Sequence, residues 1–202
     1  YAEKLFTALE TVAMSAAEFT RAAILWNFAA FNTLDKDRSV RLFLAMMHDY
    51  HPFLMSMPVH NYNPLVYYVN YAFDELVPFF EKALEIEGCH KQQVIILWLA
   101  WTHTHKTKAK ELLDAMCERT EKARISLIHF LSRSDGGLDK EETKYLCDLM
   151  KDKYYSEEMA NSCDNVFHDL EKVSIENQKA LAETFVNSKM SCGKVHGFYN
   201  FL

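Results

Sequence analysis

The chain has 202 residues, half of them hydrophobic, which is enough to bury a large core in a single domain spanning residues 1–202. Its formal net charge of -6 offers no general attraction to nucleic acid phosphates, so this segment is not expected to bind nucleic acid. No apolar run approaches the ~20 residues needed to cross a bilayer, which argues against membrane insertion.

The five cysteines are widely spaced and form no CxxC pair, which favours a reducing compartment, nuclear or cytoplasmic. Cys89, His90, His103 and His105 lack the usual spacing of zinc ligands, so no metal site is expected. The segment 134–142 places its acidic residues at the wrong positions for a calcium loop. Phosphate loops, nucleophile elbows and HExxH are missing from the sequence, so neither an enzyme nor a cofactor is expected.

Apolar residues at alternating spacings of three and four predict helices almost throughout. The first predicted helix is one long element reaching residue 26, and its stripe consists of Leu5, Leu9, Val12, Ala16, Phe19, Ala23 and Trp26. A second helix runs from about residue 36 to residue 50 and stops before Pro52. Residues 57–65 then predict a turn-rich connection that has room for a short hairpin.

Helix resumes over residues 65–87, with a kink at Pro78 and an end at Gly88. Residues 94–101, VIILWLAW, are hydrophobic all round, which indicates a helix in the middle of the protein, a strand being the alternative. Trp98 and Trp101 should then both be largely buried. A further helix is predicted over residues 106–131, a break at residues 134–137, and a final helical stripe from Met159 to Val173.

Residues 22–44, AAILWNFAAFNTLDKDRSVRLFL, join two of these helices through a short capped turn. Phe31 and Leu34 would plug the turn, Asp35 or Asp37 would cap the next helix, and Leu42 with Phe43 would bury its first apolar face. This pattern resembles the signature of nuclear hormone receptor ligand-binding domains. The order of segments 74–101 and 106–131 is similar to the divergent nematode branch.

The resemblance implies an all-α, three-layer helical sandwich with residues 94–101 in its middle layer. It also implies a regulator of transcription that binds a small apolar ligand and coregulator proteins. Since the chain begins at Tyr1, we expect a piece of a longer protein, with any DNA-binding domain lying outside it. The residues expected to contact the ligand are Phe19, Ala22, Ala23, Met46, Met47 and Tyr50; packing in an ordinary core is the alternative reading of the same apolar residues.

In ligand-activated members of the family, two basic positions hold a helical peptide of the coregulator. Here the matching positions are Trp26 and Leu44, so we expect Trp26, Arg41 and Leu44 to bind a protein helix without a charge clamp; burial of Trp26 in the core is the alternative. A second surface, suited to a homodimer or heterodimer, is predicted at Tyr154, Tyr155 and Met159. Two functions therefore stay open: a ligand-responsive regulatory domain, or a ligand-free pseudo-receptor acting as a protein-interaction adaptor in gene regulation or gene silencing.

Overall fold

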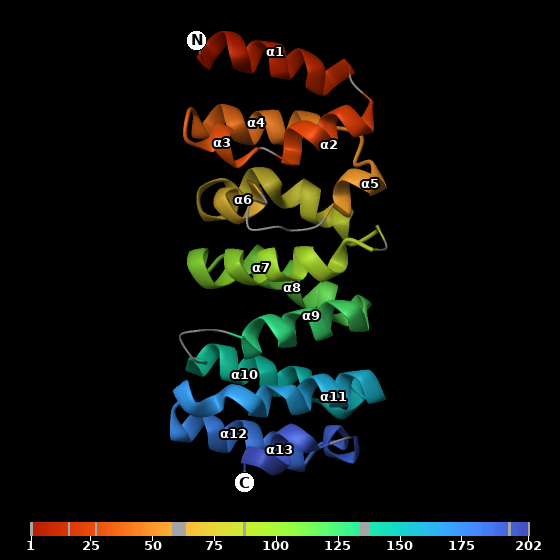
Figure 1. The fold of residues 1–202 in the computed structure, drawn as a ribbon, viewed down its shortest axis with the longest axis vertical. Helices are drawn as coiled ribbons and strands as arrows, with labels where there is room; N and C mark the ends of the chain where they lie inside the picture. The colour runs from red at the N-terminus through yellow and green to blue at the C-terminus, as the bar shows by residue number, and fades with distance from the viewer. Residues whose placement is uncertain are drawn as a thin grey trace. The chain divides into compact units, whose positions relative to one another are not determined.

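Helices account for most of the residues that this computed structural model describes, namely 2–15, 17–26, 28–57, 64–86, 88–133, 138–193 and 195–201 (Figure 1). Those ranges contain no strand, so the all-α prediction is confirmed. Backbone contacts divide the chain into two compact units, Tyr1–Arg119 and Thr120–Leu202. The expectation of a single domain stays a prediction.

The first unit is a stack of helices, some packed on the next helix in the sequence and others on a helix further along. α1 packs on α4, α4 on α6, α6 on α7, and α7 on α8, while the short helix α5 packs on α2 (Figure 1). The bounds are Ala2–Ser15 for α1, Glu18–Trp26 for α2, Ala29–Asn32 for α3, Lys36–Met46 for α4, Pro52–Met55 for α5, Pro64–Ala83 for α6, His90–Thr104 for α7 and Thr107–Arg119 for α8.

The prediction of one long first helix is wrong, because α1 ends at Ser15 and α2 begins only at Glu18. α1 buries Phe6 and Ala13, whereas α2 buries Arg21, Ala22 and Leu25. A continuous helix would have kept the predicted stripe on one face. The break instead lets α2 turn Arg21 and Leu25 inward, which leaves three residues of that stripe, Phe19, Ala23 and Trp26, on the outside.

Other boundaries follow local capping chemistry. The side chain of Asp35 accepts a hydrogen bond from the backbone N–H of Arg38 at 2.9 Å, which confirms the predicted cap of α4. The predicted helix over residues 106–131 is in fact two helices, because the side chain of Thr120 caps the N-terminus of α9 by accepting from the backbone N–H of Ala123.

In α6 the non-helical backbone lies at Ala72, upstream of the predicted kink at Pro78.

α7 lies between α6 and α8 in this stack, and the alternative prediction of a strand is wrong. Leu97 and Trp98 are fully enclosed, but Trp101 is only half-buried, with its ring edge-on to Trp98 and the ammonium of Lys110 5.1 Å from its centroid. One side of the helix is therefore partly exposed to solvent, and the two tryptophans are buried to different degrees.

The second unit is built around α11. This helix packs against α9, η2, η3 and α13, and α10 packs on α12. The bounds are Glu121–Ser132 for α9, Lys140–Leu149 for α10, Asp152–Tyr154 for η1, Glu157–Asn165 for α11, Val166–Lys172 for η2, Ile175–Val186 for α12, Lys189–Cys192 for η3 and His196–Phe201 for α13.

The predicted hairpin within 57–65 and the predicted break at 134–137 fall largely or wholly outside the described residues. Among the helices that are described, none is both long enough and apolar enough to cross a membrane.

Candidate functional site

An apolar hollow lies on the surface of the first unit where α2 meets α5. Its volume is about 360 Å³. Although large and apolar, Trp26 and Phe53 are 53% and 43% exposed on its walls. The described residues that line it are Ala22, Ala23, Trp26, Phe53, Ser56 and Met57.

A third exposed ring extends this apolar surface along α2. Phe19 is 68% exposed, and its ring centroid lies 5.2 Å from that of Phe53. Phe19, Ala23 and Trp26 are spaced four and three apart, so they share one face of the helix. The small Ala23 between two large rings leaves a depression, and we call Phe19, Ala23, Trp26 and Phe53 together the α2–α5 groove.

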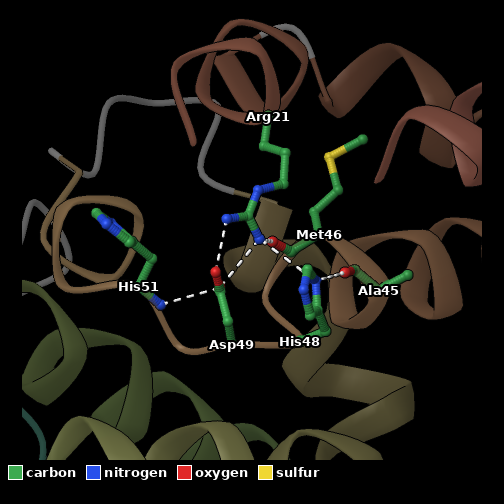
Figure 2. Close-up of polar contacts among 6 residues, drawn as sticks. All are labelled: Arg21, Ala45, Met46, His48, Asp49 and His51. Atoms are coloured by element: carbon green, nitrogen blue, oxygen red, sulfur yellow. Dashed lines mark hydrogen bonds and ion pairs between the residues drawn. The ribbon is translucent and has the colours of Figure 1, made fainter. Parts of the chain in front are cut away.

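A buried arginine holds the opposite face of α2 in place (Figure 2). The guanidinium of Arg21 donates to Asp49 Oδ1 at 3.0 Å and to Asp49 Oδ2 at 2.7 Å, a bidentate pair, and also to the carbonyl oxygen of Met46 at 2.8 Å. Figure 2 shows Arg21 pointing from its helix into the turn that carries His48 and Asp49. Because this turn leads directly into α5, the ion pair fixes both walls of the groove relative to each other.

The electrostatics of the turn follow from the same contacts. The hydrogen bond from Arg21 lowers the pKa of Asp49 to about 2, aided by the backbone N–H of His51, which donates to Oδ1 at 3.2 Å. The same ion pair raises the pKa of Arg21. Tyr50, which lies between Asp49 and His51 in the sequence, adopts a left-handed backbone with φ 48°. This conformation costs a non-glycine residue about 1–3 kcal/mol.

The structure separates the residues predicted to contact a ligand into three environments. Ala22 and Ala23 line the hollow, and Phe19 lies beside it. Met46 and Met47 are buried in the core, and Tyr50 is half-buried in the left-handed turn.

The predicted protein-interaction residues are likewise divided. Trp26 lines the hollow, whereas Arg41 and Leu44 belong to α4 and are not among its described lining residues. Tyr155 is exposed, and Tyr154 is half-buried beneath the guanidinium of Arg124, which lies 4.5 Å from its ring centroid. The predicted exposure of Met159 is wrong: Met159 faces inward from the central helix α11 and is fully buried.

Sequence reasoning missed Phe53, Ser56 and Met57, which form the second wall of the hollow. They belong to or follow a four-residue helix, too short to show any apolar periodicity. Pro52 at the start of that helix was the available signal, since proline favours the first turn.

A second hollow, of about 420 Å³, lies in the other unit and is lined by polar and charged residues together with Met150. One of them, Asp152, already accepts the backbone N–H of Lys189 at 2.7 Å. Within the described ranges, no three His, Cys, Asp or Glu side chains are grouped so that they could hold a metal ion. The α2–α5 groove is therefore the stronger candidate site.

Comparisons with known proteins identified no relative of this chain. No protein family matches the chain, and searches of curated proteins and of solved structures gave no significant match. The resemblance to nuclear receptors thus rests on the sequence motifs alone.

Proposed function

We propose that this chain is a protein-interaction adaptor whose α2–α5 groove binds an amphipathic helix of a partner protein. The observation that carries the proposal is the exposure of three aromatic rings, Phe19, Trp26 and Phe53, around one apolar hollow. Aromatic residues gathered in this way supply much of the binding energy at protein interfaces. Gene regulation or gene silencing is the setting that the sequence resemblance suggests.

The shape and chemistry of the groove indicate what it would bind. The hollow, at about 360 Å³, has room for more than one large aliphatic side chain, and Ala22 and Ala23 contribute small side chains to its lining. None of its described lining residues is charged, so a charged side chain of the partner would be buried there without a counter-charge. A helix that presents leucine, isoleucine or methionine at spacings of three and four would match the line of rings along α2.

Rigidity is the second property that favours docking. Arg21 is almost completely buried, and its hydrogen bonds to Met46 and Asp49 tie α2 to the turn before α5. A groove whose walls are fixed in advance loses little conformational entropy when a partner binds. The groove would therefore need no rearrangement of its backbone.

The second candidate is a nuclear-receptor-like ligand-binding domain with a three-layer sandwich, which binds a small apolar ligand and responds by recruiting a coregulator or dimerising. The sequence motifs support it, and so does the apolar lining of the hollow, since Ala22 and Ala23 are expected ligand contacts in that family. The burial of Met46 and Met47 in the core favours the adaptor, because these two side chains do not line this hollow.

The test is a selection of amphipathic helices from a displayed peptide library against the full chain, followed by titration of the best synthetic peptide. Trp26→Ala and Phe53→Ala should each weaken its binding about tenfold or more. Phe130→Ala, which removes an exposed ring of α9, is the matched control and should leave the affinity unchanged. Equal affinity for the wild type and all three variants would show that the groove is not the binding site of the helix.

The same proteins distinguish the second candidate. Native mass spectrometry of the purified chain, and titration with a fluorescent long-chain fatty acid, would detect an apolar ligand. If the fatty acid binds and displaces the helix from the wild-type chain, the groove is a ligand site. If the helix binds and the fatty acid does not, the adaptor proposal stands.

A further inference from the structure

The C-terminal helix α13 of the second unit is held at its first turn by one buried carboxylate. Asp164, near the end of α11, accepts the backbone N–H of Gly197 on Oδ2 and that of Phe198 on Oδ1, each at 2.8 Å. Both N–H groups belong to the first turn of α13, where a helix has no carbonyl partners of its own. A carboxylate at this end of a helix also complements the positive end of the helix dipole.

Gly197 allows α13 to come this close. A Cβ atom added there would lie 2.3 Å from the carbonyl oxygen of Asp164, a backbone atom that cannot move aside. The close approach places Phe198 against two rings of the unit, with centroids 4.9 Å from Phe167 and 5.3 Å from Phe185. Phe201, one turn later, lies 5.6 Å from Phe167.

α13 depends on this docking for its structure. It has six residues, at most half of the ~12–15 that an isolated helix needs to be even marginally stable in water. It packs on η2 and α11, while its other side faces solvent, with Tyr199 76% exposed. Docking and helix formation are therefore one event at this end of the chain.

We propose that α13 is a detachable strap: it opens without unfolding the rest of its unit, and the site it leaves, formed by Asp164, Phe167 and Phe185, accepts the same helix from a second copy of the chain. The occupant is already seated on the site within one chain, so an identical segment of another copy carries the complementary chemistry. Its recognition elements are two backbone N–H groups, a glycine and two phenylalanine rings, spaced as Gly197, Phe198 and Phe201.

Hydrogen exchange on the full chain tests the opening. Gly197→Ala should quicken amide exchange in residues 196–201 by about tenfold or more, while the amides of residues 159–163 in α11 keep their wild-type protection. Tyr199→Ala, on the exposed side of the same helix, is the control and should change neither. If α11 loses protection together with α13, or if Gly197→Ala does not fold, α13 is an integral part of the unit and the strap is wrong; unchanged exchange in α13 would contradict it equally.

A labelled peptide of residues 195–201 tests acceptance from another chain. It should bind the Gly197→Ala protein, whose site is vacated, and bind the wild type at least about tenfold more weakly. Adding Asp164→Asn to Gly197→Ala should weaken binding again, because the amide replaces one acceptor oxygen by a donor. A peptide carrying Phe201→Ala is the negative control. No binding to the vacated site, or binding that Asp164→Asn and the control peptide leave unchanged, would overturn the proposal.

Discussion

Arg21 and Asp49 are 28 residues apart in the sequence, yet both oxygens of the carboxylate accept hydrogen bonds from the same guanidinium, at 3.0 and 2.7 Å (Figure 2). The two partners differ in burial: the side chain of Arg21 is 4% exposed, and that of Asp49 is 39% exposed. Removing Asp49 would therefore leave a buried cation, whereas removing Arg21 would leave a partly solvated anion.

We predict that Asp49→Ala destabilises the first unit more than Arg21→Met does. Without Asp49 the guanidinium stays buried with no counter-charge, which should cost about 2–4 kcal/mol. Methionine fills the space of the arginine stem, and water can solvate the remaining carboxylate, so Arg21→Met should cost about 1–2 kcal/mol. Urea unfolding followed by tryptophan fluorescence measures both, since all three tryptophans lie in the first unit. A greater loss for Arg21→Met would contradict this account of the pair.

The same pair should make stability depend on acid. The pKa of Asp49 is lowered to about 2 in the folded chain, against ~3.9 for an unperturbed aspartate. Its contribution is therefore complete above about pH 4 and is lost as the pH falls toward 2. Melting temperatures between pH 5 and pH 2 should fall less steeply for Asp49→Asn than for the wild type. Parallel curves would show that the ion pair contributes nothing to folding.

The parts of the fold that could be predicted are those set by nearby residues. The cap at Asp35 and the helix containing Leu97 follow from side chains within a few positions of one another. The break before Glu18 could not be predicted, because the orientation of α2 depends on the pairing of Arg21 with a residue far along the chain. Without knowledge of such a contact, the sequence does not show whether an apolar residue on a helical stripe faces the core or the solvent.

The candidate site illustrates the same limit. Trp26 was predicted to bind a partner together with Arg41 and Leu44, its neighbours in the pattern of the family. In the structure the second wall comes instead from Phe53, on a helix that packs on α2 and is too short to be recognised by periodicity. The exposed aromatic residue was predicted, and the surface to which it belongs was not.

The cysteines should differ in thiol reactivity, with the more buried thiols reacting more slowly. Burial raises the pKa of Cys89 to about 11 and that of Cys163 to about 12, and Cys117 is buried as well. Thiolate is the reactive form, so these three should react slowly with Ellman's reagent at pH 8, whereas the exposed Cys192 should react first. Cys192→Ser should abolish the fastest phase. Survival of that phase would place a second accessible thiol on the surface.

Leu97→Ala should destabilise the first unit by about 2–5 kcal/mol, because Leu97 is fully buried in α7 and truncation leaves a cavity. Leu34→Ala is a suitable control, since Leu34 is more than half exposed and its truncation should cost below about 0.5 kcal/mol. Chemical unfolding of both variants gives the comparison. Similar losses for the two would mean that α7 is not at the centre of the packing in its unit.

The α2–α5 groove can be observed directly through the indole N–H of Trp26. The chain has three tryptophans, and a Trp26→Phe variant assigns the Trp26 signal in the nitrogen-15 spectrum of the full chain. On titration with a selected amphipathic helix, the account predicts that the Trp26 signal shifts saturably while that of the buried Trp98 stays in place, and that Phe53→Ala reduces the saturation. A helix that binds tightly and leaves the Trp26 signal unmoved would contradict it.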